Sequence, residues 1–95
     1  MLNMKVLEDI IYGFLREARI RYKEVWIDRI KITSSKVFLY MVVGEERVKA
    51  IIYRDNVRVR VYSRLKGLSI SLQRIIKREY RKALKRWERE REESI

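Results

Sequence analysis

The chain has 95 residues, of which 24 are Lys or Arg and 13 are Asp or Glu, so its formal net charge is +11. This length allows one domain, residues 1–95, and a hydrophobic content of 47% is enough for a folded core. The chain contains no Cys and no His, which excludes disulfides, thiol chemistry, imidazole catalysis and zinc sites built from these residues.

The composition also indicates where the protein works. Charged residues reach 39%, Pro is absent and only three amide side chains occur, a pattern that favours a hyperthermophilic source. The longest apolar run, residues 37–43, is far shorter than the ~18 residues of a membrane-spanning helix. Glu8 and Asp9 near the start do not fit an export signal. We therefore expect a cytoplasmic protein that does not contact membranes.

Residues 4–22 are predicted to form an amphipathic helix, because apolar residues recur there at spacings of three and four. Asn3 precedes this segment as an N-cap, whose side-chain oxygen can accept from a first-turn amide. Gly13 inside the helix costs about 1 kcal/mol relative to Ala. A close contact between this helix and the sheet would explain the glycine.

From residue 25 to residue 63 the apolar period changes to two, which is typical of strands. Breaks at Ser34-Ser35, Gly44-Glu45-Glu46 and Asp55-Asn56 divide this region. The predicted strands are 25–32, 36–43, 47–54 and 57–63. Connections this short require antiparallel neighbours, so we expect a four-stranded antiparallel meander. Asp55-Asn56 suits a two-residue hairpin turn with positive φ angles.

A second helix is predicted over residues 71–92, capped by Ser69 or Ser71 after a connection at 64–70. The predicted fold class is α+β: the meander is flanked by an N-terminal and a C-terminal helix, both on one face of the sheet. The charge is uneven along this order. Residues 1–24 hold five bases and four acids, residues 25–63 eight and four, and residues 64–95 eleven and five. A functional surface is therefore expected on the sheet and the last helix.

A turn at Asp55-Asn56 also predicts the register of the last hairpin, with Tyr53 opposite Arg58, Ile51 opposite Arg60 and Lys49 opposite Tyr62. These residues share one face of the sheet, opposite the apolar face on which the helices are expected to pack. A turn at Glu45-Glu46 would add three more apolar or aromatic residues to that face, namely Phe38, Tyr40 and Val42. Three interpretations stay open: a platform for single-stranded nucleic acid, a homodimer interface, or cross-strand stacking of Tyr and Arg that binds nothing.

As a nucleic-acid platform, this face would stack bases on Tyr40, Tyr53 and Tyr62, each base contributing about 1–3 kcal/mol. Phosphates would meet the sheet cations Lys49, Arg58 and Arg60. The basic side of the last helix would extend the track through Arg74, Lys77, Arg78, Arg81, Lys82 and Lys85. That side is equally well explained as a solvated helix face. Only Gln73 and Arg74 suit base reading from a helix, so sequence-specific recognition is not expected.

A metal-dependent nuclease needs two or three carboxylates around a divalent cation. Asp28, Glu45 or Glu46, and Lys49 loosely echo the pattern of restriction-endonuclease-like nucleases, which use carboxylates around a divalent cation. That family separates the acid from the lysine by one position on a strand, whereas two positions separate Glu46 from Lys49 here. We therefore expect no enzyme, with a metal-dependent nuclease as the alternative, and no cofactor or metal site.

In its short length and basic composition, rich in Ile, Val, Tyr, Arg and Glu and without Cys, His or Pro, the chain resembles the small uncharacterised proteins of crenarchaeal rod-shaped viruses, a rudivirus-like group. The strand at 36–43 and the Arg/Glu-rich end carry this resemblance. It implies action inside a hot archaeal host, in genome handling, expression control or interference with defence. Four meandering strands followed by a helix also look like the repeat of PUR-type single-stranded nucleic-acid binders, an analogy of fold alone.

Together these features predict a homodimeric, non-enzymatic protein that binds DNA or RNA with low sequence specificity and favours single strands. The alternative is a homodimeric protein-interaction module that docks on an acidic host or viral protein and has no nucleic-acid role. Steering by charge serves both functions.

Overall fold

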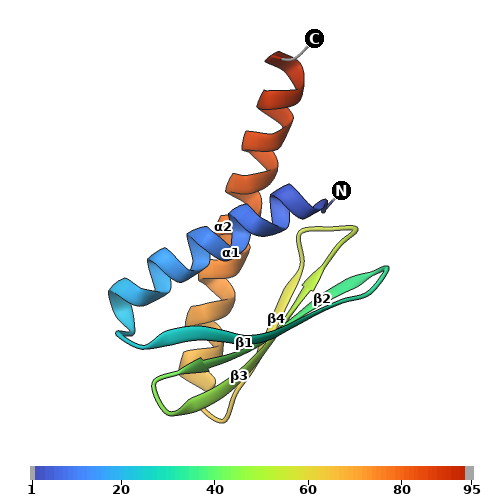
Figure 1. Cartoon of the computed structure of the whole chain (residues 1–95). Helices are drawn as coiled ribbons and strands as arrows, with labels where there is room; N and C mark the ends of the chain where they lie inside the picture. The colour runs from blue at the N-terminus through green and yellow to red at the C-terminus, as the bar shows by residue number, and fades with distance from the viewer. Residues whose placement is uncertain (1, 94–95) are drawn as a thin grey trace.

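The structure, a computed structural model, describes residues 2–93 and has the predicted α+β order (Figure 1). Helix α1 precedes a four-stranded antiparallel sheet with strand order β1-β2-β3-β4, and helix α2 follows it. The helices are α1 (Met4–Arg21) and α2 (Lys66–Glu93), and the strands are β1 (Val25–Ile32), β2 (Lys36–Val43), β3 (Glu46–Tyr53) and β4 (Val59–Tyr62). Fold class and meander are confirmed.

Helix α1 begins as predicted. The Asn3 side chain accepts a hydrogen bond from the Val6 amide at 2.9 Å, and this satisfies one of the donors left free in the first turn. The helix ends at Arg21, after which Tyr22 is extended. Its buried stripe is Val6, Leu7, Ile10, Gly13, Phe14 and Ala18.

The turn between β2 and β3 is displaced from the predicted position. Its two residues are Gly44 and Glu45 rather than Glu45 and Glu46, because Val43 pairs with Glu46. Gly44 has a φ of +61°, a conformation that glycine adopts without steric cost. The register therefore differs by two residues from the predicted one. Since side chains alternate with period two, every residue of both strands keeps the face that was predicted for it.

The register of the last hairpin is confirmed, with Lys49 opposite Tyr62 and Ile51 opposite Arg60. The predicted two-residue turn is wrong: β3 ends at Tyr53, β4 begins at Val59, and no non-glycine residue of the described chain has a positive φ. Arg54 explains the wider loop. Its amide donates to the Ser35 carbonyl and its guanidinium to the Thr33 carbonyl, so the loop between β1 and β2 holds Arg54 away from the β3–β4 hairpin.

Helix α2 begins at Lys66, five residues before the predicted start, so Ser69 and Ser71 lie inside it and are not caps. The Ser69 amide donates a hydrogen bond to the Leu65 carbonyl, which extends the helical hydrogen bonding upstream. The Ser63 hydroxyl donates to the same carbonyl. With 28 residues α2 is about 42 Å long. Its C-terminal half therefore projects beyond the sheet (Figure 1).

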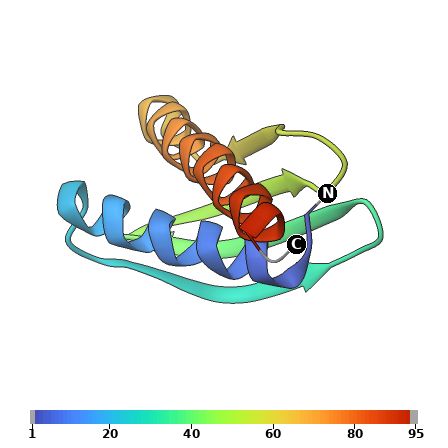
Figure 2. The same cartoon turned by 90° about the horizontal axis from the view of Figure 1, so that it is seen from above.

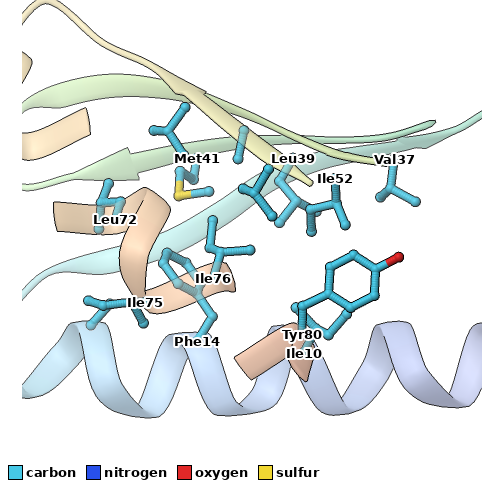
Figure 3. Packing of buried hydrophobic residues seen from close by; sticks show 14 of the residues in the cluster. Ile10, Phe14, Val37, Leu39, Met41, Ile52, Leu72, Ile75, Ile76 and Tyr80 are labelled. Carbon is cyan, nitrogen blue, oxygen red and sulfur yellow. The ribbon is translucent and has the colours of Figure 1, made fainter. Parts of the chain in front are cut away.

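Both helices cover the same face of the sheet (Figures 1 and 2). Helix α2 packs over β4 and against α1, and α1 also contacts β1. Strand β2 shows the one-sided burial most clearly, because its residues alternate strictly between half-buried and buried. Figure 3 shows side chains of both helices meeting Leu39, Met41 and Ile52 from the sheet. One hydrophobic core thus lies between the sheet and the helices.

Gly13 sits at the contact between the two helices, not between a helix and the sheet as predicted. A Cβ at this position would overlap the Glu79 side chain of α2. Glu79 is 4% exposed, and its Oε2 accepts no hydrogen bond from the described residues. Lys82 Nζ lies 3.5 Å from that oxygen. The glycine therefore makes room for a buried carboxylate at the helix crossing.

Candidate nucleic-acid interface

The sheet face opposite the helices, called the outer face below, is left uncovered by the described residues. Every second residue of each strand points to it, so its members follow from the pairing register. It contains the rings of Trp26, Phe38, Tyr40, Tyr53 and Tyr62, the cations Arg29, Lys31, Lys36, Arg47, Lys49, Arg58 and Arg60, and the aliphatic Val42 and Ile51. An uncovered antiparallel face is usually polar. This one combines rings with positive charge.

Strand β1 contributes to the outer face through a β-bulge at Asp28. Ile27 pairs with Met41, but Arg29 pairs with Tyr40, so Asp28 is the extra residue. The bulge reverses the alternation and brings Arg29 and Lys31 to the outer face. The sequence-based prediction missed these two cations because it assigned no register to this strand. The signal was present, since apolar positions change parity between Ile27 and Ile30.

Cations and rings alternate across neighbouring strands of the outer face. The Arg29 guanidinium lies 4.7 Å from the centre of the Tyr40 ring, and Lys49 Nζ lies 5.4 Å from that of Tyr62. Tyr53 has two such neighbours, Arg58 at 5.0 Å and Lys36 at 5.7 Å. These distances are typical of cation–π pairs worth about 0.5–1 kcal/mol at exposed sites.

The rings differ in how much surface they leave for a ligand. Tyr62 is 47% exposed and Trp26 is 45% exposed, whereas Tyr40 and Tyr53 are half-buried. Tyr53 is the least available, because cations from two sides approach it. Cross-strand stacking is therefore present, as the third interpretation of this face expected, but it leaves Tyr62 with an open surface.

A hollow of about 400 Å³ crosses the outer face and has walls from all four strands. Its lining combines two tyrosines, three cations and one carboxylate: Asp28, Arg29, Tyr40, Val42, Arg47, Lys49 and Tyr62, with contributions from Met41 and Val48. Volumes of roughly 300–1,000 Å³ are usual for small-ligand sites. The hollow joins predicted residues to three that sequence analysis did not assign to this surface, namely Asp28, Arg29 and Arg47.

The charge on the outer face is uncompensated. None of its seven cations forms an ion pair with an acid among residues 2–93. Helix α2 is only partly compensated: Arg78 lies 3.9 Å from both Glu17 and Glu79 and Lys82 lies 3.5 Å from Glu79, whereas Arg74, Lys77, Arg81 and Lys85 form no ion pair among residues 2–93. Cations without acidic partners keep their charge available for an outside anion.

The predicted binding residues fall into two groups on opposite sides of the fold. The sheet group of Tyr40, Lys49, Tyr53, Arg58, Arg60 and Tyr62 is brought together on the outer face. The helix group of Arg74, Lys77, Arg78, Arg81, Lys82 and Lys85 lies on α2, which covers the other face. The sheet lies between the outer face and the first half of α2, whereas Arg81, Lys82 and Lys85 belong to the C-terminal half that projects beyond the sheet.

Gln73, which the sequence marked as a residue suited to base reading, has a structural contact. Its Oε1 accepts a hydrogen bond at 3.2 Å from the amide of Val61, a donor on the edge strand β4. Helix α2 thereby covers a sheet edge that would otherwise expose an unpaired amide. Arg74, the other such residue, is exposed.

The carboxylates of the nuclease-like pattern do not gather. Glu46 pairs with Arg64 at 2.7 Å, and Asp28 lies in the hollow on the outer face. Across residues 2–93 no three acidic side chains come close enough together to hold a metal ion. In the same residues no helix has the length and apolar character needed to cross a bilayer.

Comparisons with protein-family models, with curated proteins and with solved structures returned no match for this chain. Its function must therefore be inferred from its own residues.

Proposed function

We propose that this protein is a non-enzymatic nucleic-acid-binding protein that holds single strands against the outer face with low sequence specificity. The observation that carries this proposal is the uncompensated charge of that face: seven cations, without ion pairs in the described chain, surround exposed aromatic rings. A polyanion that also presents flat apolar surfaces satisfies both features. Such a protein would work in the cytoplasm.

Single strands fit the outer face better than duplexes. Only unpaired bases expose the ring faces that can stack on tyrosine, with about 1–3 kcal/mol per base. Tyr62 offers an open ring, and Lys49 beside it can contact the phosphate of the same nucleotide. Among residues 2–93, this face carries no Asn or Gln, the side chains that pair with adenine in the major groove, so it is poorly suited to read a run of base pairs.

The exposed cations of α2 have a different role in this proposal. They belong to a helix that packs on the opposite side of the sheet, or to its C-terminal half, which projects beyond the sheet. Their charge attracts the polyanion from a distance at low salt but forms no contact with it. Arg81 and Lys85 of α2 therefore provide a matched control for two cations of the sheet.

Binding of a fluorescent single-stranded oligonucleotide, measured at several salt concentrations, tests the proposal. Each phosphate that a cation neutralises contributes about 0.7 to the slope of log K against log salt for single strands. The double substitution Lys49→Ala with Arg60→Ala should make this slope shallower by about 1.4. The control pair Arg81→Ala with Lys85→Ala removes the same charge and should leave the slope nearly unchanged.

Two results would refute the proposal. One is absence of binding at low salt; the other is an equal effect of the two double substitutions, which would mean that net charge alone attracts the strand. Tyr62→Ala adds a second readout: it should weaken single-strand binding by about 5- to 150-fold, the range for one stacked base, and affect duplex binding much less.

The alternative function, a protein-interaction module, uses the same cations against an acidic protein. Binding to an acidic polypeptide without binding to any oligonucleotide would favour it. A homodimer formed face to face through the outer face is disfavoured, because a two-fold interface would oppose the seven cations of one copy to the same seven of the other. The predicted homodimer stays a prediction, and it would have to bring the apolar part of this face together without opposing the cations.

A further inference from the structure

Asp28, the extra residue of the β-bulge, is the one carboxylate of the described chain that lines the hollow on the outer face. On a surface that binds phosphates, a carboxylate opposes the ligand. The chain nevertheless places Asp28 at a β-bulge, a feature that commonly re-aims a side chain near a functional site. There it lines the hollow together with Tyr40 and Tyr62. This position calls for a role other than holding the backbone of the strand.

The carboxylate oxygens of Asp28 accept no hydrogen bond from the described residues. Within residues 2–93 Asp28 forms neither an ion pair nor a side-chain hydrogen bond, although cations line the same hollow. The Arg29 guanidinium lies over the Tyr40 ring at 4.7 Å and Lys49 Nζ over Tyr62 at 5.4 Å. Both cations therefore lie over rings and not beside Asp28. An ionised carboxylate only accepts hydrogen bonds, so its ligand must present N–H donors.

We propose that the hollow holds one unpaired guanine base, whose Watson–Crick edge donates to Asp28. This inference rests on the proposed function and names the base that the same site prefers. Guanine presents its ring N1–H and its exocyclic amine side by side, so both can reach the two carboxylate oxygens. Thymine and uracil present one N–H between two carbonyl oxygens, which a carboxylate repels. Cytosine and adenine offer one amine beside a ring acceptor and fall between these cases.

The other lining residues complete the site. The open ring of Tyr62 offers a stacking surface for the base, and the half-buried Tyr40 ring forms part of the wall. Arg47 and Lys49 are exposed at the rim, where the phosphates flanking the inserted base would pass. The hollow of about 400 Å³ has room for a base, and among the described residues a single carboxylate, Asp28, lines it. The preference should therefore apply to one position of the bound strand.

The test uses oligothymidylate strands of equal length that differ only at one central nucleotide. A single guanine avoids self-association of guanine-rich strands. Hydrogen bonds to a charged group contribute enough for about tenfold discrimination, so the wild-type protein should bind the guanine strand about tenfold more tightly than plain oligothymidylate. Inosine keeps N1–H but lacks the amine, and should lose about half of that preference on a logarithmic scale.

Asp28→Asn provides the decisive variant, because it keeps the shape of the side chain and removes the charge. It should abolish the guanine preference while binding oligothymidylate as well as, or more tightly than, the wild type. Asp55→Asn makes the same change in the β3–β4 loop, outside the hollow, and should retain the preference. A general fold defect would weaken all strands together, and a simple charge effect would strengthen all of them equally.

The outcomes separate this inference from the proposed function. Equal affinity of the wild type for the guanine and thymine strands, or an equal change for all strands in Asp28→Asn, overturns the guanine site and leaves single-strand binding in place. Absence of binding to every strand at low salt overturns the proposed function itself.

Discussion

Gly13→Ala should destabilise the fold, although the helix propensities of glycine and alanine alone would predict the opposite. Alanine is favoured over glycine by about 1 kcal/mol inside a helix. At this position, however, the new Cβ would overlap the carboxylate of Glu79 at the crossing of α1 and α2. Glu79 is buried between the helices, so its side chain has little room to move aside.

The expected magnitude follows from these two opposing terms. Overpacking of a well-packed site costs about 1–3 kcal/mol, and the gain in helix propensity offsets about 1 kcal/mol of this. The net loss should be about 1 kcal/mol. When Glu79 is first replaced by Ala, the overlap disappears and only the propensity gain remains. Gly13→Ala should then stabilise the protein, which corresponds to a coupling energy of about 2 kcal/mol between the two positions.

The four proteins of this double-mutant cycle can be compared by urea unfolding followed by circular dichroism. Gly67→Ala is a matched control, because this second helical glycine has no atom within 4 Å of an added Cβ. It should stabilise the protein by less than about 1 kcal/mol in either background. If Gly13→Ala stabilises the protein equally with and without Glu79, the argument from the helix crossing is refuted.

Two further contacts give predictions that the same unfolding assay checks. The Tyr80 hydroxyl donates to the Tyr53 carbonyl at 2.7 Å, and Tyr80→Phe should cost about 1 kcal/mol. Burial, with a smaller effect of Asp55, raises the pKa of Tyr80 from 10.0 to about 12. Because the folded state holds the hydroxyl proton of Tyr80 more tightly than the unfolded state, the contribution of this proton to stability is complete below pH 10 and is lost as the pH rises towards 12. The wild-type protein should therefore lose more stability than Tyr80→Phe between pH 10 and pH 12, and an equal loss in both proteins would contradict this. Gln73→Ala should cost about 1 kcal/mol by leaving the Val61 amide without its acceptor, and should leave oligonucleotide binding unchanged; a selective loss of binding would instead make Gln73 part of the interface.

Most of the fold could be predicted because it depends on period and chain order. The change from helical spacing to alternation marked the sheet, and short connections required a meander. The outer face of β2 and β3 was also predictable, even though the turn was placed one residue too late. A register error of two residues moves Tyr40 from Ile51 to Lys49 but leaves it on the same face.

The remaining features depend on contacts between distant parts of the chain. The wide loop after Tyr53 forms because Arg54 bonds to Thr33 and Ser35, which local turn preferences do not reveal. The reason for Gly13 is a side chain that lies 66 residues further along the chain, at Glu79. The early start of α2 likewise depends on bonds around Leu65 and not on a strong capping residue. Local patterns therefore predicted the elements better than their ends.

The candidate site shows most clearly what composition leaves undetermined. Counted along the chain, the last helix is its most basic segment. The structure pairs Arg78 and Lys82 of that helix with acids, whereas all seven sheet cations lack an ion pair among residues 2–93, as do the helix cations Arg74, Lys77, Arg81 and Lys85. A cation compensated within the fold contributes less to an outside anion than an uncompensated one. The bulge at Asp28 adds Arg29 and Lys31 to the uncompensated set. What distinguishes the outer face from the helix is that its cations lie beside aromatic rings, and this is why we propose it as the surface for a polyanion that also exposes bases.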